Sequence, residues 1–416
     1  MPSYTQTRRV AALSHAMGRI GEYMERSTYM RRAGDPAICD FAFGNPHDMP
    51  MPNYVDVLQR ALVPEDKNWF AYKMNEPASQ QVVASSLSER FGMPFEPDDI
   101  ALTAAGFAAI FVALTAVVDA GDEVIFNLPP WFFYGLATVA AGGVPVTVPV
   151  DAATFDLNLA AIEAAITPRT RAIIVNTPCN PTGKIYPPET LERLAILLDE
   201  ASRRNDRTIY LISDEAYNRI VFDGIQFHTP LEYYPNAMMA YSYGKTLMAP
   251  GQRIGYLALP PTMPDREQLH QDIFVSQVTN AWAFPNAQLL HALPDLDQLR
   301  PDVERLQRKR DRMVGALRDI GYDVHMPEGT FYLFPRSPIA DDWAFVELLE
   351  QREIFCHPGT ISEVPGHFRI SLTANEDMIE RSLPGFQSAI DEAHRLVTSS
   401  EPAQTVTPAS TADGAA

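Results

Sequence analysis

Four short stretches of this chain carry side chains whose types and spacing could do chemistry. In chain order they are NTPCNPTG at 176–183, SDEAY at 213–217, SYGK at 242–245 and GQRIG at 251–255. The first three follow short apolar runs, so each predicts a turn at the end of a strand. Open α/β sheets bind ligands at the carboxyl ends of their strands. The stretches therefore place a carboxamide, a carboxylate, an amine and a guanidinium where a ligand could bind.

Each of these residues also has an ordinary structural explanation. Asp214, at the end of a buried strand, is poorly solvated and needs a cationic partner, but it could instead cap the next helix. Lys245 taken alone could be a solvated surface residue. Ser242 lies in AYSYG, which resembles a nucleophile elbow whose first glycine is replaced, so a serine hydrolase stays open. A histidine partner for such a serine carries no motif of its own.

A late arginine offers a second kind of contact. In the run FRISL, Phe368, Ile370 and Leu372 fall on one face of a strand. Arg369 and Ser371 fall on the other face. If that face lines a cleft, the planar fork of the guanidinium matches a carboxylate.

The spacing of apolar residues predicts the elements that position these groups. β-rich runs recur between helical stretches at 100–104, 123–128, 144–150, 172–176, 208–213, 237–241 and 254–259. Seven strands with interleaved helices predict a three-layer α/β sheet. A second group, with helices at 302–319, 341–352 and 376–397 and strands at 329–334 and 367–372, predicts a smaller α+β domain. We expect the last helix to be interrupted at Pro384-Gly385.

Composition narrows the class of protein. The chain has 416 residues with 33 Lys plus Arg and 52 Asp plus Glu, a net charge of −19. Nucleic-acid and anionic-membrane binding both need a basic footprint, so neither partner is expected. Three widely spaced cysteines form no disulfide framework and no metal-binding pair, so we expect a cytoplasmic protein without a metal. The stretch 399–416 has one large apolar residue, Val406, and is expected to be a disordered tail.

The four stretches and the late arginine, in this order, resemble the pyridoxal-phosphate-dependent aminotransferases of class I/II, the aspartate aminotransferase family with fold type I. The likeness runs from about Ser14 to about Val397, and Lys245 and Arg253 are eight residues apart, as in that family. The resemblance implies an α/β fold, with a seven-stranded, mostly parallel sheet between helices and a smaller α+β domain. We expect a large cofactor-binding domain at 53–295 and a small C-terminal domain at 296–398, and we expect the N-terminal segment 1–52 to join the small domain.

The resemblance also implies roles for the residues that handle the cofactor, pyridoxal 5'-phosphate. Lys245 matches the lysine that holds the cofactor as a Schiff base and then moves the substrate proton. Asp214 matches the carboxylate that keeps the pyridine nitrogen protonated. Asn180 and Tyr217 match the pair that hydrogen-bonds the ring oxygen. Trp131 matches the aromatic side chain that stacks on the ring.

The phosphate would be held by a further group of residues. The matching positions are Ser242, Arg253, the backbone of Gly106, Phe107 and Ala108 at a helix start, and Tyr72, which in the family reaches over from the partner subunit. A homodimer with its sites at the subunit interface is therefore expected.

For the substrate, Arg369 matches the arginine that binds the α-carboxylate, with help from Asn180, Trp131 and the backbone of Gly44. The expected reaction moves an amino group from an L-amino acid to a 2-oxo acid. A carbon–sulfur lyase or a decarboxylase on the same scaffold is the alternative. A cofactor-sensing regulator is less suited, because no helix-turn-helix would fit before Ser14.

The side-chain pocket is expected to prefer apolar or aromatic substrates over aspartate. Phe107 stands where some dicarboxylate-using relatives carry a lysine, and 131–134 reads WFFY. The stretch 275–288, where other members supply a second arginine, has no basic residue. A second buried carboxylate would then lack a counter-charge, unless Arg19 or Lys73 supplied it.

Overall fold

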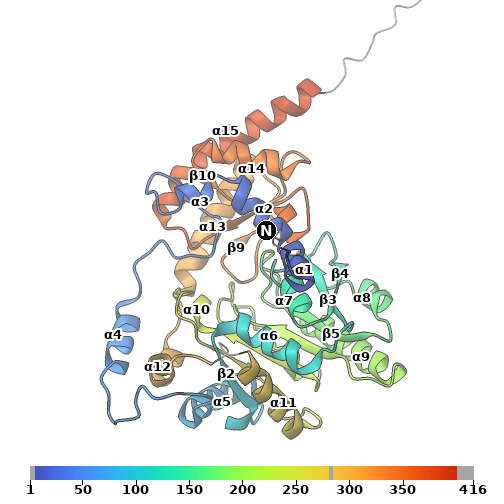
Figure 1. Cartoon of the computed structure of the whole chain (residues 1–416). Helices are drawn as coiled ribbons and strands as arrows, with labels where there is room; N and C mark the ends of the chain where they lie inside the picture. Colours follow the sequence, from blue (N-terminus) through green and yellow to red (C-terminus); the bar gives the residue numbers. More distant parts are fainter. Residues whose placement is uncertain (1–4, 281–283, 401–416) are drawn as a thin grey trace, which may run out of the picture.

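The computed structural model describes residues 5–280 and 284–400. In Figure 1 a large sheet with its helices fills the lower part of the molecule, and a smaller group of helices and short strands lies above it. Segments from both the N-terminal and the C-terminal ends of the chain contribute to the upper group. This arrangement creates a boundary between the two parts, and the strand ends of the large sheet face it.

Within the described residues, seven strands form the large sheet. They are β2 (Ile100–Thr103), β3 (Glu123–Leu128), β4 (Val144–Pro149), β5 (Thr170–Asn176), β6 (Tyr210–Asp214), β7 (Ala237–Ser242) and β8 (Gly255–Ala258). Their order across the sheet is β2-β8-β7-β6-β5-β3-β4. β8 runs antiparallel to both of its neighbours, whereas β7, β6, β5, β3 and β4 pair in parallel. The predicted mostly parallel sheet is confirmed.

Apolar side chains cover both faces of this sheet, as a parallel sheet requires. Along β5, Ile173 and Val175 join the core on one face, and Ala172 and Ile174 join the core on the other. The first core includes α4 (Pro52–Ala61), α5 (Pro77–Phe91), α8 (Leu159–Ala165), α9 (Pro188–Arg204) and α12 (Ala287–Gln298). The second includes α6 (Ala105–Val117), α7 (Tyr134–Ala140) and α11 (Arg266–Thr279).

The smaller part has its own core, drawn mainly from the end of the chain, with further residues from 39–41 and 216–222. It contains α13 (Val303–Ile320), α14 (Asp342–Glu350), α15 (Glu376–Ser400), β9 (Tyr332–Leu333), β10 (Ile354–Phe355), β11 (His357–Pro358) and β12 (Phe368–Ser371). β12 lies between β11 and β9 and runs antiparallel to both. The predicted smaller α+β unit therefore has the expected kinds of element.

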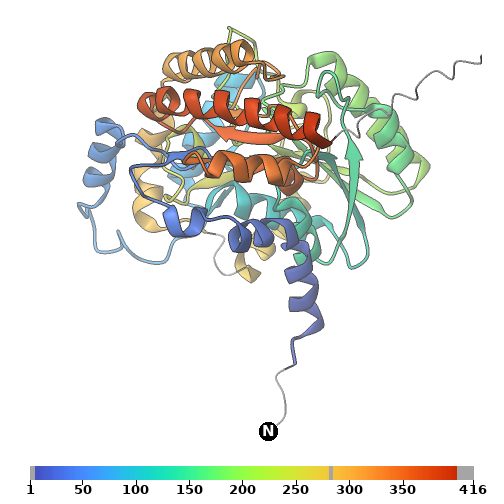
Figure 2. The same ribbon diagram turned by 90° about the horizontal axis from the view of Figure 1, so that it is seen from above.

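The N-terminal segment packs mainly against this smaller part. It forms α1 (Arg8–Ala16), α2 (Gly18–Arg26), α3 (Tyr29–Arg32) and β1 (Cys39–Asp40). β1 pairs in parallel with β10, and Ile20 and Tyr23 of α2 are buried with Trp343 of α14. Figure 2 shows α1 projecting from the body, and none of its residues is buried.

The structure differs from the expectations in the final helix. We expected an interruption at Pro384-Gly385, but α15 continues through both residues. A Cβ on Gly385 would lie 2.6 Å from Cδ1 of Ile354, so the glycine lets the helix pack closely on β10. Packing against the core outweighs the cost of proline and glycine inside a helix. Most of the tail expected at 399–416 lies outside the described residues.

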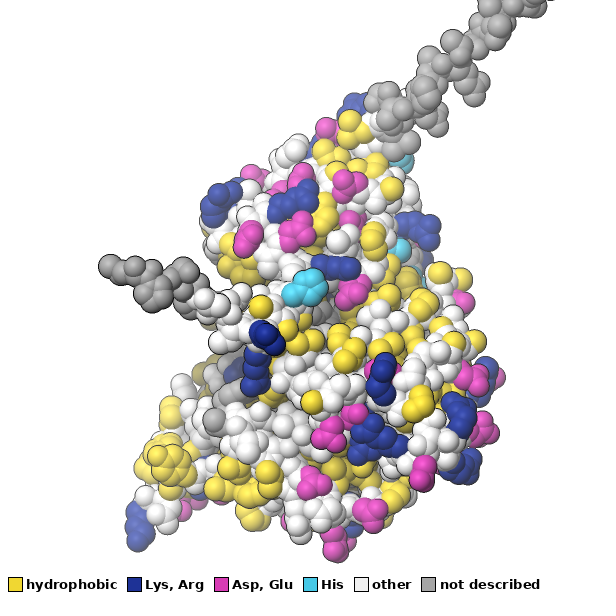
Figure 3. Space-filling view, turned by 45° about the vertical axis from the view of Figure 1, so that its right-hand side comes forward, with side chains coloured by type: hydrophobic (Ala, Val, Ile, Leu, Met, Phe, Trp, Pro, Cys, Tyr) yellow, Lys and Arg dark blue, Asp and Glu magenta, His cyan; other side chains and the backbone are white. Residues whose placement is uncertain are grey.

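Two further properties concern the molecular surface. On the face shown in Figure 3, acidic and basic side chains are interspersed. Among residues 5–280 and 284–400, no helix is both long enough and apolar enough to cross a membrane.

Candidate active site

One cavity gathers most of the residues singled out in the sequence. It has a volume of about 380 Å³. Its lining includes Gly44, Gly106, Phe107, Trp131, Asn180, Asp214, Tyr217, Ser242, Lys245, Arg253 and Arg369. These residues come from the strand ends of the large sheet and from the smaller part above it. Packing of the two parts therefore brings together groups that are more than 300 residues apart in the chain.

The parallel register of the sheet explains why the strand-end residues meet. Asn176 at the end of β5 is the direct partner of Asp214 at the end of β6. Nδ2 of Asn176 donates to the Asp214 carbonyl oxygen at 2.8 Å, and its Oδ1 accepts from the Asn180 backbone N–H at 2.6 Å. Asn176 thereby fixes the turn that presents Asn180 to the cavity.

Asp214 is a buried carboxylate with a phenol as its hydrogen-bond donor. The hydroxyl of Tyr134, on α7, donates to Oδ2 of Asp214 at 2.6 Å. Burial raises the pKa of the Asp214 carboxyl, and the bond from Tyr134 and the charge of Lys245 partly oppose that rise. A cation placed beside this carboxyl would be strongly attracted, because few other charges screen it.

Lys245 lies in α10 (Tyr243–Thr246), directly after β7. Its Nζ is close to the backbone of Gly44, since a Cβ on that glycine would lie 3.5 Å from it. The same Cβ would lie 2.5 Å from the hydroxyl of Tyr332, so any side chain at position 44 would displace the phenol. Glycine is thus required here by the close approach of the backbone to the site.

Two tyrosines, Tyr217 and Tyr332, line the cavity together with this amine. Burial raises the pKa of the Tyr217 hydroxyl. Burial acts in the same direction on Tyr332, but the positive charges of Lys245 and Arg369 outweigh it and lower the pKa of that hydroxyl. The rings of Tyr217 and Tyr332 meet edge to face, with centroids 5.9 Å apart.

The other end of the cavity is suited to an anion. α6 begins immediately after β2, and its N-cap residue Ala104 makes no side-chain hydrogen bond to the first turn. The backbone N–H groups of Gly106 and its neighbours are therefore available, and the helix dipole favours negative charge there. Ser242 and Arg253 line the same cavity. The Arg253 guanidinium donates to the Pro250 carbonyl oxygen at 2.8 Å and forms no ion pair with a carboxylate of the described residues.

Aromatic side chains form one wall. The ring of Trp131 meets that of Phe107 edge to face, with centroids 5.0 Å apart, and meets that of Phe133 in the same way at 5.2 Å. Phe107 stacks on Phe133 at 5.3 Å. Trp131 is half-buried and lines the cavity, so part of its surface faces the open space.

Arg369 is buried and held by neutral acceptors. Its Nη1 donates to Oδ1 of Asn180 at 3.2 Å, and its Nη2 donates to the Ala42 carbonyl oxygen at 2.7 Å. Nη2 also contacts Nδ1 of His357 at 2.8 Å. The guanidinium lies over the ring of Tyr332 at 4.5 Å, and its Nε has no hydrogen-bond partner in the part of the chain that the structure describes. It thus retains capacity to bind an incoming acceptor.

Two predicted residues do not line this cavity. Ala108 is buried within α6, one turn into the helix, where only its backbone could contribute. Tyr72 is fully exposed and is absent from the lining. A single chain therefore does not bring Tyr72 to the site.

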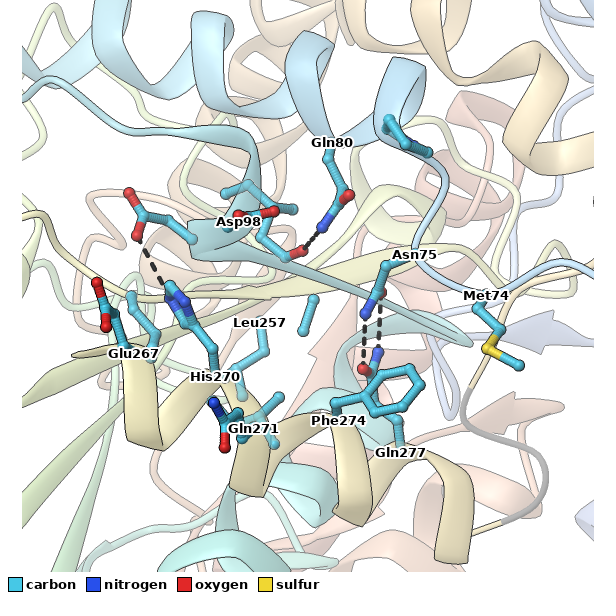
Figure 4. A pocket seen from close by; sticks show the side chains of 16 residues that line it. Met74, Asn75, Gln80, Asp98, Leu257, Glu267, His270, Gln271, Phe274 and Gln277 are labelled. Carbon is cyan, nitrogen blue, oxygen red and sulfur yellow. Dashed lines mark hydrogen bonds and ion pairs between the residues drawn. The ribbon is translucent and has the colours of Figure 1, made fainter. Parts of the chain in front are cut away.

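A second cavity of about 680 Å³ lies between α5, β2, β8 and α11 (Figure 4). Figure 4 shows Asn75 and Gln277 facing each other across paired hydrogen bonds of 2.9 and 3.1 Å. Its lining includes Asp98, Glu267 and His270, and none of the described residues that line it is a lysine or arginine. An acidic lining does not suit an anionic ligand, so this cavity is a poorer candidate despite its size.

Sequence reasoning missed three residues at or beside the site: Tyr134, Tyr332 and His357. Tyr134 stands in the aromatic run at 131–134, but nothing local indicates that its hydroxyl reaches Asp214, 80 residues away. Tyr332 lies in an ordinary strand pattern. His357 has no motif around it. Only the packing of separate elements identifies them.

The site also bears on the hydrolase alternative. No histidine is among the described residues that line the cavity with Ser242. His357, which lies beside the cavity residue Arg369, already contacts that guanidinium through Nδ1. Among the described residues that line the cavity, Ser242 therefore has no histidine to act as its general base.

Comparisons with known proteins agree with this geometry. A family model described as aminotransferase class I and II matches residues 37–383. The aspartate/prephenate aminotransferase of Thermus thermophilus is 31% identical over 375 residues, covering 88% of this chain and 94% of the relative. The probable aspartate/prephenate aminotransferase of Aquifex aeolicus is 28% identical, covering 87% and 93%. Among solved structures, an amino transferase from Eubacterium rectale superimposes with a TM-score of 0.83 at 27% identity, covering 94% of this chain and 96% of the other.

Proposed function

The chain belongs to the class I and II aminotransferases, and from that premise we propose which residues carry out the reaction and which substrates they accept. It is a pyridoxal-phosphate-dependent aminotransferase that transfers an amino group from an L-amino acid to a 2-oxo acid. These relatives do not favour a carbon–sulfur lyase or a decarboxylase. One observation carries the proposal: a primary amine, a buried carboxylate and two guanidinium groups converge on one cavity.

The cavity fits the cofactor in each of its parts. The uncapped start of α6 and the unpaired Arg253 suit a phosphate. The half-buried Trp131 suits the face of a planar ring. Asp214 is buried, and Lys245 is the cation that acts on its carboxyl, so the site suits a protonated ring nitrogen. When bound, pyridoxal phosphate supplies a reactive aldehyde carbon and a ring that accepts electrons from the substrate.

The polar side chains that line the cavity would then have different roles in the reaction. Lys245 Nζ would hold the cofactor and would carry the proton at the substrate Cα. Asp214 keeps the ring nitrogen protonated, with Tyr134 fixing the carboxylate. Asn180 and Tyr217 donate hydrogen bonds to the ring oxygen. Arg369 binds the substrate α-carboxylate and thereby orients Cα toward Lys245.

The substrate side chain would meet an apolar surface. Ile20 and Met24 of α2 line the cavity together with Phe43, Phe107 and Phe132. Its three cations, Lys245, Arg253 and Arg369, already have roles in this scheme, and neither Arg19 nor Lys73 lines it within one chain. We therefore propose a donor with an apolar or aromatic side chain, although the relatives above are named for aspartate and prephenate.

We also propose a homodimer in which Tyr72 completes the partner's site. Tyr72 is fully exposed, and its neighbours Phe70 and Met74 are also exposed. Val275 and Val278 on α11 add further exposed apolar side chains. A second subunit would cover such surface, and the Tyr72 hydroxyl could then reach a phosphate that it does not approach within its own chain.

The experiment that tests the function uses the holoprotein and single amino acids. Aspartate, glutamate, leucine, methionine and phenylalanine are compared with one fixed 2-oxo acid, and kcat/KM is measured for each. We expect amino transfer to the oxo acid, with leucine, methionine or phenylalanine as the best donor. Ammonia and pyruvate released without an oxo acid would indicate a lyase. A preference of about tenfold or more for aspartate or glutamate, about 1.4 kcal/mol, would contradict the apolar pocket.

A further inference from the structure

His357 and Arg369 face each other across two strands of the smaller sheet. β11 and β12 are antiparallel, and their register pairs His357 directly with Arg369. Directly opposed residues point to the same face of a sheet, so both side chains turn toward the cavity side. The contact of 2.8 Å between Nη2 of Arg369 and Nδ1 of His357 follows from this register.

The chemistry of the contact fixes which histidine nitrogen carries the proton. A guanidinium has only donors, so Nδ1 must supply a lone pair, and the remaining proton of the neutral ring sits on Nε2. Complete burial and the charge of Arg369 hold the pKa of His357 well below its usual range, so the ring stays neutral. Nε2 has no hydrogen-bond partner among the described residues. The imidazole meets the rings of Tyr23 and Phe43 edge to face, at 4.6 and 4.5 Å.

We propose that His357 is a positioning residue, which fixes the guanidinium of Arg369 through a neutral acceptor and leaves its positive charge free for the substrate α-carboxylate. The proposal rests on the proposed role of Arg369. Three of the five guanidinium N–H groups donate to Asn180, Ala42 and His357. All three acceptors are uncharged, so they orient the group without neutralising it.

The charge of the acceptor matters because the site is buried. Arg369 is 3% exposed, and no carboxylate of the described residues pairs with it. An aspartate or glutamate in place of His357 would satisfy the same N–H group but would also compete with the substrate for the charge. A leucine or valine would leave the N–H group without an acceptor. A neutral imidazole accepts the hydrogen bond from the N–H group and does not neutralise the charge of Arg369.

A purely structural role for His357 is the competing explanation, since the ring also fills space between Tyr23 and Phe43. The variants His357→Asn and His357→Leu separate the two. Both side chains have nearly the same shape and both remove the ring, but only asparagine places an acceptor oxygen near the position of Nδ1. Any loss of packing is common to the pair, so a difference between them reports the acceptor.

The measurements are steady-state kinetics with the best amino donor and calorimetric binding of 3-phenylpropanoate, a carboxylate without an amino group, to the holoprotein. For His357→Leu we expect about a ten- to hundredfold rise in KM and in the dissociation constant, with kcat changed less than about threefold. His357→Asn should stay within about threefold of wild type. In an Arg369→Lys background, the His357→Leu substitution should add almost nothing, because the contact is already lost.

The wild-type protein gives an independent readout. With ¹⁵N-labelled histidine, the signal that disappears in His357→Asn should show a neutral ring protonated at Nε2. A ring protonated at Nδ1, or equal kinetics for the leucine and asparagine variants, would overturn the role of His357. If Arg369→Lys leaves the binding of 3-phenylpropanoate unchanged, the proposed role of Arg369 is wrong. This result would be distinct from a failure of the role of His357, in which Arg369→Lys weakens binding but the two His357 variants behave alike. Should neither variant fold, the His357 signal is assigned instead through the resonances of its own residue in the wild-type protein, and the tautomer still decides.

Discussion

At the scale of single residues, Lys245 is the group on which the proposed chemistry depends. It is the lysine that lines the cavity, and its Nζ lies near Gly44 and Tyr332 rather than in an ion pair. The partly buried Lys184, by contrast, is paired with Glu328 at 2.8 Å. An amine free of a carboxylate partner is available for covalent catalysis.

We expect Lys245→Ala to abolish turnover, because no other described lysine lines the cavity, while still allowing the cofactor to bind through its phosphate and ring contacts. The measurement is peptide mapping of the wild-type holoprotein after borohydride reduction. The pyridoxyl label should appear on Lys245. Recovery of the label on Lys184 or any other lysine would refute the assignment.

The second residue-scale prediction concerns the Tyr134–Asp214 pair. Tyr134→Phe removes a charge-assisted hydrogen bond of 2.6 Å, so kcat should fall about tenfold, or about 1.4 kcal/mol of barrier. Asp214→Ala should cost more than about a hundredfold, because it removes the charge itself.

Tyr234→Phe is the matched control for Tyr134→Phe. It also deletes a buried phenol, one that donates to the Ile209 carbonyl oxygen at 2.7 Å, but it lies outside the cavity. This variant should lower the thermal midpoint with little effect on kcat. Equal kcat values for the two phenylalanine variants would mean that Tyr134 has no part in the reaction.

At the scale of elements, a buried glutamate joins the end of β6 to the segments that follow it. Glu215 accepts hydrogen bonds from Ser213 at 2.9 Å, from Asn218 at 3.0 Å and from Thr229 at 2.6 Å. Thr229 is the N-cap of a short 3-10 helix at Pro230–Glu232. These bonds hold the loop after Asp214 in place, and Tyr217 lies in that loop.

Stability should therefore depend on pH through Glu215. Burial raises its pKa from 4.5 to about 7 in the folded protein. Between those values the folded state keeps a proton that the unfolded state has lost, so the free energy of unfolding falls as pH rises from 4.5 to about 7. The decrease is on the order of 3 kcal/mol, from about 1.4 kcal/mol per pKa unit, and the contribution is constant above the folded pKa.

Glu215→Gln removes this ionisation, so its thermal midpoint relative to wild type should increase between pH 5 and pH 8. The control is Glu163→Gln on the exposed surface of α8, for which the difference from wild type should not change with pH. A constant difference between Glu215→Gln and wild type across this range would show that Glu215 is ionised throughout. The absolute midpoints matter less than this change, because cofactor binding affects all three proteins alike.

At the scale of the whole molecule, we propose that the chain folds as two domains that enclose the site. The large domain would begin at 53, and the small domain would combine the N-terminal segment with the C-terminal elements. The boundary expected at 295/296 would fall inside α12, which packs against α4 and α5, so we propose to place it after that helix, between Gln298 and Val303. Because the site lies between the two domains, their relative position governs access to Arg369 and Lys245.

The proposed homodimer predicts that two inactive variants restore activity to each other when their subunits exchange. Lys245→Ala and Tyr72→Ala subunits are mixed, and the dimers are allowed to exchange. If Tyr72 serves the partner's site, each mixed dimer contains one intact site, so activity should rise well above that of either parent. Light scattering on the same samples should report a dimer. The control is the same mixture measured before exchange.

No gain after complete exchange would mean that Tyr72 acts within its own chain or has no role. A fully active monomer would exclude the shared site altogether.

The sequence by itself determined the strands, most of the helices and the residues at the strand ends. These features depend on local periodicity and on motifs of a few residues, such as SYGK before Arg253, and they carry the resemblance that identified the cofactor. The interruption expected at Pro384 was wrong, because local propensity there is overridden by packing on β10.

Only the tertiary structure decided which side chains support the catalytic groups. Tyr134 reaches Asp214 because α7 packs on the sheet, and His357 meets Arg369 because two short strands pair in one particular register. A shift of one residue in that register would turn the imidazole to the opposite face. Such contacts arise from the global packing of elements distant in the chain, and no local pattern of residues encodes them.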